Sequence, residues 1–278
     1  MPRPIVRLTR RTLLTDFGAA GVGLIVLGAC GGSSGSSSAP PSSAATDVEP
    51  TDPVTTTAPM PEEATSSSSE PESSVPDEGA ESGGELRLQH VSLGFVSAYV
   101  LVRGSEAAIV DTGTSGSRDA IFEGLDALAV MPSAVRHIVL THNHGDHIGG
   151  LGDLEAELAG ATVYAGAADI GSIRSTLPLT ELNDGDEVFG MGVIGTPGHT
   201  PGSISLFDTG SGILVAGDAI NGDGTGGLSG ADPDFSSDLG AAAASVAKLA
   251  ALSPTAVAFG HGGPPVTEDV AAKLAALV

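Results

Sequence analysis

The stretch THNHGDHIGG, residues 141–150, places three histidines and one aspartate within six consecutive positions, in a chain with seven histidines among 278 residues. It follows the apolar run RHIVL, residues 136–140, which predicts a buried strand. His142 and His144 are two residues apart at the end of that strand, so their side chains point to the same face. Gly145 permits a sharp turn that brings Asp146 and His147 back toward them. One loop therefore offers three imidazoles and a carboxylate, which suit Zn²⁺.

Three further residues of the same chemical type occur downstream, each before a glycine-containing turn. His199 lies in TPGHTPG, Asp218 ends the predicted strand GILVAGD, and His261 ends the predicted strand AVAFGHG. Functional groups tend to collect in such loops at strand ends. Asp223 is an alternative to Asp218, but the strand-end position favours Asp218. Seven candidate ligands are too many for one tetrahedral metal and suit two metals that share a carboxylate.

The remainder of the folded part predicts alternating strands and helices. Strands are expected at residues 85–91, 97–103, 107–113, 136–142, 161–166, 186–198, 203–208, 212–218 and 256–262. Helices are expected at residues 118–130, 153–160, 238–252 and 267–277, with Pro132 stopping the first. Residues 221–230 are glycine-rich and predict a plain loop. Two groups of strands, each followed by helices, favour an α/β fold with helices outside two packed sheets.

The motifs HNHGDH, TPGHTPGSI, AGD and GHGGPP, in this order, resemble the metallo-β-lactamase superfamily over essentially all of residues 86–278. The resemblance implies a four-layer αββα sandwich with the site at one edge. It also implies that Asp111 orients a ligand loop. Carried over residue by residue, it implies a first metal held by His142, His144 and His199, a second held by Asp146, His147 and His261, and a bridging Asp218.

This ligand set is similar to that of glyoxalase-II-type thioester hydrolases and lactonases. It implies a dinuclear zinc hydrolase, in which two zinc ions lower the pKa of bound water toward 7 and generate a hydroxide nucleophile. The expected substrate is a small ester, lactone, thioester or lactam. Asp146 is expected to be a metal ligand that also helps to steer a proton to the leaving group.

Two alternatives stay open. A mononuclear iron persulfide dioxygenase would share the HxHxDH pattern and use only two histidines and one aspartate as ligands. A non-catalytic metal-binding lipoprotein would keep the fold for binding alone. Tyr99 and Tyr164 are the only tyrosines; either could assist an oxyanion, but both are expected to be strand packing residues.

The first 30 residues predict an export signal. Arg10 and Arg11 precede the uncharged apolar run 17–29, which is too short to span a membrane. The arginine pair resembles a twin-arginine signal. Cys30, the only cysteine, ends LGAC, which resembles a bacterial lipobox. We therefore expect an exported protein, anchored by lipid at Cys30 to the extracytoplasmic face of the cell membrane.

Residues 31–85 are rich in Ser, Pro, Thr, Ala and acids and predict a disordered linker ahead of the domain at 86–278. The whole chain has 34 Asp and Glu against 11 Lys and Arg, which gives a net charge of −23. Such an acidic chain has little to neutralise phosphates, so nucleic-acid binding is disfavoured. The expected partner is a small-molecule substrate, and the sequence leaves the oligomeric state open.

Overall fold

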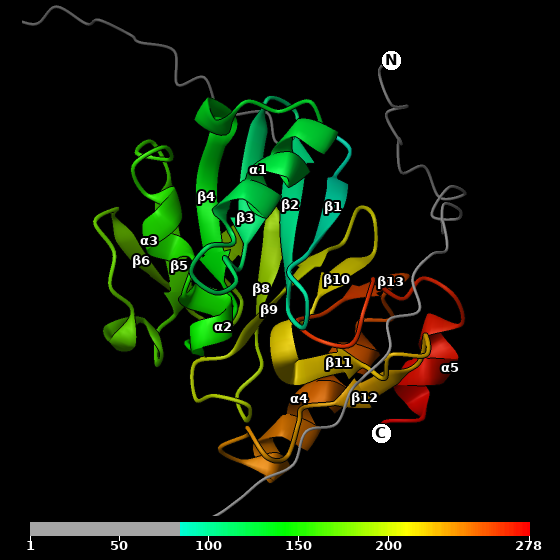
Figure 1. Cartoon of the computed structure of the whole chain (residues 1–278). Helices are drawn as coiled ribbons and strands as arrows, with labels where there is room; N and C mark the ends of the chain where they lie inside the picture. Colours follow the sequence, from blue (N-terminus) through cyan, green and yellow to red (C-terminus); the bar gives the residue numbers. More distant parts are fainter. Residues whose placement is uncertain (1–83) are drawn as a thin grey trace, which may run out of the picture. The chain divides into compact units, whose positions relative to one another are not determined.

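A computed structural model describes residues 84–278 (Figure 1). The first sheet has six strands in the order β1-β2-β3-β4-β5-β6. Its first three strands are antiparallel neighbours, and β3 to β6 run parallel. The strands are β1 (Arg87–Ser92), β2 (Ser97–Arg103), β3 (Glu106–Val110), β4 (Val135–Leu140), β5 (Thr162–Gly166) and β6 (Leu179–Leu182).

The second sheet has five strands in the order β13-β10-β9-β8-β7, in which β13 is parallel to β10 and the other neighbours are antiparallel. A separate hairpin pairs β11 with β12. The bounds are β7 (Glu187–Val188), β8 (Met191–Gly195), β9 (Ile204–Asp208), β10 (Ile213–Val215), β11 (Ile220–Gly222), β12 (Leu228–Gly230) and β13 (Ala256–Ala258).

Helices cover the outer face of each sheet. Figure 1 shows α1 over the first sheet and α4 and α5 beside the second. The helices are α1 (Arg118–Ala127), α2 (Gly145–Ile148), α3 (Leu151–Leu154), α4 (Leu239–Ala251) and α5 (Val270–Ala275). Asp238 begins α4 by accepting a hydrogen bond from the N–H of Ala241.

Three buried apolar clusters correspond to the three contacts between these layers. Ile121 and Leu125 of α1 pack with one face of the first sheet. Leu101 on its other face packs with Met191 of the second sheet, in the cluster between the sheets. Leu249 of α4 belongs to the third cluster, on the outer face of the second sheet. The expected four-layer αββα sandwich is thereby confirmed, because each sheet is apolar on both faces.

Several predicted elements differ from the structure. The first helix ends at Ala127 rather than at residue 130, because Ala129 has a left-handed φ of 56° that breaks the helix. The helix predicted at 153–160 is α3, which begins earlier at Leu151 and is only one turn long. The last helix, expected at 267–277, is limited to residues 270–275.

Residues 186–198, predicted as one strand, form the hairpin β7–β8. Phe189 and Gly190 make its two-residue turn, with φ values of 54° and 66°, as expected for a tight hairpin connection. The glycine-rich segment 221–230, predicted as a plain loop, contributes the hairpin β11–β12. The sequence analysis missed β6, an edge strand with mostly exposed side chains and therefore no apolar pattern.

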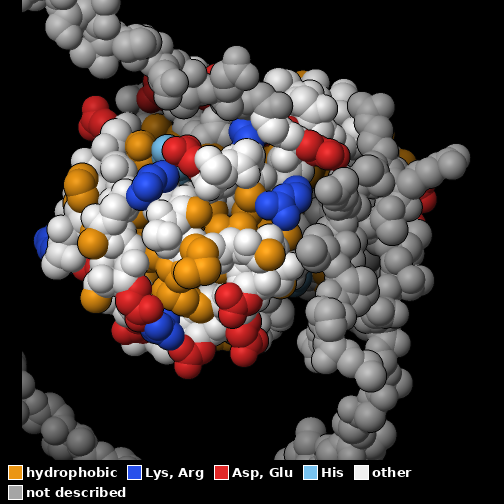
Figure 2. All heavy atoms as spheres, turned by 90° about the horizontal axis from the view of Figure 1, so that it is seen from above, with side chains coloured by type: hydrophobic (Ala, Val, Ile, Leu, Met, Phe, Trp, Pro, Cys, Tyr) orange, Lys and Arg blue, Asp and Glu red, His pale blue; other side chains and the backbone are white. Residues whose placement is uncertain are grey.

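One face of the domain shows no cluster of positive charge. On the face drawn in Figure 2, Lys and Arg side chains lie singly among hydrophobic and acidic side chains. The predicted signal at 1–30, its Cys30, and all but the last two residues of the linker at 31–85 lie outside the described residues. Within residues 84–278, none of the helices is long and apolar enough to cross a membrane.

Candidate metal centre

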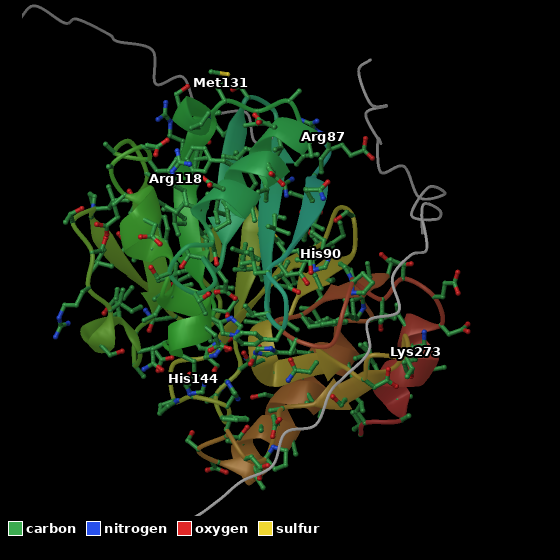
Figure 3. The ribbon with its side chains drawn as sticks, in the orientation of Figure 1. Arg87, His90, Arg118, Met131, His144 and Lys273 are labelled. Carbon is green, nitrogen blue, oxygen red and sulfur yellow. The ribbon has the colours of Figure 1, made fainter. Side chains whose placement is uncertain are left out.

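Three histidines from two loops form the first group. His142 and His144 follow β4, and His199 lies between β8 and β9. Their ligand atoms all lie within 4.8 Å of one another, and Nε2 of His199 is 2.9 Å from Nδ1 of His144. His142 and His199 are buried, whereas His144 is half-buried. Figure 3 shows His144 at the end of the sheets, close to α2.

Asp146, His147 and His261 form the second group. Asp146 and His147 lie on α2, and His261 follows β13. Nε2 of His261 is 3.3 Å from Nε2 of His147 and 3.3 Å from Oδ2 of Asp146. Helix α2 thus turns its two polar side chains toward a loop that is more than a hundred residues away in the chain.

Asp218 lies between the two groups. Its Oδ2 is 3.4 Å from Nε2 of His199 and 3.2 Å from Nε2 of His261. Its Oδ1 is 3.4 Å from Nε2 of His147. One carboxylate therefore contacts histidines of both groups, which is the position that the sequence analysis expected for a bridging ligand.

Two glycines allow this close approach. Gly217 has a φ of 56°, and a Cβ at this position would lie 2.8 Å from Cβ of Thr141. A Cβ at Gly260 would lie 2.0 Å from Oδ1 of Asp218. Neither position has space for a side chain, so glycine is needed for Asp218 to reach the centre.

Hydrogen bonds on the far side of the imidazole rings fix their orientation. Nδ1 of His147 donates to Oδ2 of Asp111 over 2.8 Å, and Nδ1 of His261 donates to the carbonyl of Phe95 over 2.7 Å. The hydroxyl of Thr141 donates to Asp111 at 2.8 Å, so it accepts from Nδ1 of His142 at 3.0 Å. In each case Nδ1 is bonded on the far side of the ring, and Nε2 is the nitrogen that faces the centre and could bind a metal ion.

Burial and the neighbouring charges shift the pKa values of the side chains at the centre. Burial lowers the pKa of His142 well below its usual range and also lowers that of His199. Burial opposes a charge on His147, but the carboxylates of Asp111 and Asp218 outweigh it and raise the pKa of His147 to about 10. Burial likewise opposes the charge on Asp218, yet the neighbouring imidazoles of His147 and His261 hold its pKa well below the usual range.

The donor set fits a pair of metal ions. Nε2 of His142 and Oδ1 of Asp218 are buried without a hydrogen-bond partner in the described part of the chain. Leaving such groups unsatisfied costs about 1–3 kcal/mol each. Ligands bound tetrahedrally at about 2.0–2.1 Å from Zn²⁺ lie about 3.3 Å apart, close to the 3.2–3.4 Å that separate the donor atoms around Asp218. Metal ions bound here would satisfy both orphaned atoms.

The structure thus brings together all seven side chains that the sequence analysis selected, although Asp218 lies in the 3₁₀ turn Gly217–Ala219 rather than at the end of β10. Asp223 is exposed and accepts hydrogen bonds within its own hairpin turn. The hydroxyl of Tyr99 is fully used by the backbone of Phe259, which agrees with a packing role.

The sequence analysis missed Thr141 and three further groups that bond the ligand residues directly. Besides the carbonyl of Phe95, they are Ser236, whose hydroxyl lies 3.3 Å from Nδ1 of His199, and Asn221, whose Oδ1 accepts from the N–H of His261 at 3.3 Å. A glycine-rich or polar loop gives no sequence signal that such a contact will form. Only the fold brings these loops to the ligands.

Comparison with known proteins identifies the family. The profile described as "Metallo-beta-lactamase superfamily" matches residues 91–169 and 174–261, and these ranges include all seven selected residues. The chain therefore belongs to the metallo-β-lactamase superfamily.

Individual relatives share only part of the sequence with this chain. YobT of Bacillus subtilis is 32% identical over 147 residues, which cover 45% of this chain and 62% of YobT. A hydroxyacylglutathione hydrolase of Fuscovulum blasticum is 37% identical over 144 residues, which cover 49% of this chain and 52% of the relative. The chain thus spans less than two thirds of either relative. Among solved structures, TTHA1623 in a di-iron-bound form superposes with a TM-score of 0.52 and 26% identity, covering 64% of this chain and 93% of that chain.

Proposed function

We propose that the chain is a dinuclear zinc hydrolase that acts on a small ester, lactone, thioester or lactam. The observation that carries the proposal is the position of Asp218, whose two oxygens contact histidines of both groups. Two groups of donors that share a carboxylate suit a pair of ions better than a single ion. Similarity to a hydroxyacylglutathione hydrolase supports hydrolysis.

Each residue has a defined place in this proposal. His142, His144 and His199 would hold the first zinc, Asp146, His147 and His261 the second, and Asp218 both. The bound ions would supply an activated water at neutral pH and Lewis acidity toward the substrate. The chain itself orients the ligands, because Asp111 and the carbonyl of Phe95 fix the rings of His147 and His261.

Asp146 is the ligand that we propose also transfers a proton. Its side chain is 28% exposed, whereas that of Asp218 is 5% exposed. It lies on the rim of the centre, with Oδ2 at 3.3 Å from Nε2 of His261. A carboxylate at the rim can pass a proton to a leaving group that departs toward solvent, and the enclosed Asp218 cannot.

Metal content and activity test the proposal together. We expect about two zinc ions per chain and hydrolysis of at least one compound in a panel of esters, lactones, thioesters and lactams. Asp218→Ala should lower turnover by at least about 100-fold, because it removes a ligand of both ions. Asp223→Ala is the matched control, since Asp223 is an exposed aspartate five residues away that contacts only its own turn, and it should keep full activity.

Other results would redirect the assignment. TTHA1623 has been solved in a di-iron form, so two iron ions with retained hydrolysis would change the metal and keep the reaction. A single iron per chain with persulfide oxidation would favour the dioxygenase alternative. Bound metal without turnover on the whole panel would favour a binding protein.

We also propose that the protein is exported and anchored by lipid at Cys30, as the LGAC motif indicates. Replacing Cys30 with Ser should move the protein from the membrane fraction to the soluble fraction, because it removes the acylation site. Retention of the Cys30→Ser variant in the membrane would contradict the anchor. Replacing the Arg10–Arg11 pair with lysines should block export if the twin-arginine route is used.

A further inference from the structure

A buried carboxylate outside the seven proposed ligands joins two of the loops that carry them. Asp169 follows β5 and is 1% exposed. Its Oδ2 accepts from the backbone N–H of Asn143 at 3.1 Å and from the hydroxyl of Thr200 at 2.6 Å. Its Oδ1 accepts from the backbone N–H of Gly202 at 2.9 Å. One side chain therefore receives three hydrogen bonds from two separate loops.

These three donors flank the histidines of the first group. Asn143 lies between His142 and His144, and Thr200 directly follows His199. The hydrogen bonds of Asp169 thus fix the two loops relative to each other at the residues next to the proposed ligands. None of its side-chain hydrogen bonds goes to α2 or to the loop after β13, which carry the second group.

The loop that carries Gly202 packs closely against Asp169. A Cβ at Gly202 would lie 2.4 Å from the backbone nitrogen of Asp169 and 2.6 Å from its Cγ, so this loop approaches closely only because residue 202 is glycine. Thr200 is held in turn by Ser203, whose Oγ lies 2.7 Å from Oγ1 of Thr200 and accepts from its N–H at 3.0 Å.

The charge of Asp169 has no salt-bridge partner. Within residues 84–278, Asp169 forms no ion pair with Lys, Arg or His, and its oxygens are satisfied by the three donors alone. Burying an ionised group costs several kcal/mol unless hydrogen bonds compensate. Moving either loop away would deprive this buried carboxylate of one or two of its three donors, so its burial favours the arrangement in which both loops stay against Asp169.

We infer that Asp169 is a positioning residue for the first metal, acting through Asn143, Thr200 and Gly202 on the group His142, His144 and His199. The inference rests on the proposed function, since it takes this group as a metal site. It adds a specific consequence: loss of the Asp169 carboxylate weakens one metal site and leaves the other unchanged.

Asp169→Asn in the full chain tests this. The amide keeps the size of the side chain but has one acceptor oxygen, so it cannot accept from both Gly202 and the Asn143–Thr200 pair. We expect calorimetric zinc titration to show one of the two affinities reduced by about 10–100-fold, with the other within twofold of the parent. Titration with Co²⁺, followed by its visible absorption, should show the same loss at one site.

Asp208→Asn is the matched control. Asp208 is also buried, and its partners are Arg103 and Ser211, which belong to neither ligand loop. This variant should lose stability and keep both zinc affinities. If Asp169→Asn does not fold, Thr200→Val removes one of the three bonds and should weaken the same site. Thr200→Ser keeps the hydroxyl and should restore the affinity.

Amide hydrogen exchange gives a readout that needs no metal. The N–H groups of Asn143 and Gly202 should exchange faster in Asp169→Asn than in the parent and in Asp208→Asn. Zinc affinities in Asp169→Asn and Thr200→Val that match the parent, or that fall equally at both sites, would overturn the inference. A parent chain that binds no zinc or iron would instead overturn the proposed function, and the exchange rates would still decide whether Asp169 holds the loops.

Discussion

Replacing Tyr99 with Phe removes one oxygen atom that holds the strand before His261. The hydroxyl of Tyr99 donates to the carbonyl of Phe259 at 2.7 Å and accepts from the N–H of the same residue at 3.0 Å. Tyr99 is 2% exposed and Phe259 is 1% exposed, so water cannot replace the hydroxyl. In the described residues, neither backbone group of Phe259 has another hydrogen-bond partner.

The expected loss follows from these contacts. Each buried backbone group left without a partner costs about 1–3 kcal/mol, and two such groups cost roughly 2–6 kcal/mol. Removing the buried hydroxyl itself offsets part of this. We therefore expect Tyr99→Phe to lower the free energy of unfolding by about 2–4 kcal/mol, which corresponds to about 4–16 °C in Tm for a domain of this size.

Urea unfolding followed by circular dichroism measures this difference. Tyr164→Phe is the matched control, because Tyr164 is the only other tyrosine and its hydroxyl makes no hydrogen bond within the described residues. It should change the free energy of unfolding by less than about 0.5 kcal/mol. If the two variants were equally stable, the reasoning that the Tyr99 hydroxyl satisfies Phe259 would be refuted.

Two further predictions concern the carboxylates. Asp111→Asn should lower zinc affinity by about 10–100-fold, because the amide no longer fixes the proton on Nδ1 of His147. If calorimetry showed an unchanged zinc affinity, it would contradict the role of Asp111 in orienting His147. The pKa of Asp208 is lowered, since hydrogen bonds from Ser211 and Arg103 outweigh the effect of burial. Its contribution to stability is therefore present above about pH 4, the pKa in the unfolded chain, and is lost as the pH falls through the lower folded value. The urea midpoint of Asp208→Asn should fall less steeply than that of the parent between about pH 4 and about pH 2. If the two midpoints fell in parallel with pH, this role of Asp208 would be excluded.

The sequence predicted the centre well because its chemistry is local. His142, His144, Asp146 and His147 come from six consecutive residues, in which the end of a strand and the short helix α2 that follows it are enough to bring ligands together. Asp218 was preferred to Asp223 because it follows an apolar strand, and the structure places Asp218 at the centre and Asp223 on the surface.

The supports of the centre could not be predicted in the same way. The carbonyl of Phe95 and the carboxylate of Asp169 reach ligand loops that are far away in the chain. A backbone carbonyl carries no sequence signal, and a single aspartate after a strand reads as a turn residue. Their roles depend on the packing of the two sheets, which brings the strand ends together.

The hairpin at Phe189 was missed for a related reason. Tight two-residue turns are usually marked by Asn-Gly or Asp-Gly, whereas this turn is Phe189-Gly190, with Phe189 held at a φ of 54°. The exposed edge strand β6 was missed because its side chains show no buried alternation. In both places tertiary contacts decide the structure against the local pattern.

Anomalous diffraction at the zinc absorption edge, on crystals of the zinc-loaded protein, tests the central claim most directly. We expect two peaks, one bound by His142, His144 and His199 and the other by Asp146, His147 and His261. Asp218 should contact both at about 2.0–2.2 Å. No peak at this centre, or a single peak with Asp218 turned away from it, would contradict the account of two metals that share one carboxylate.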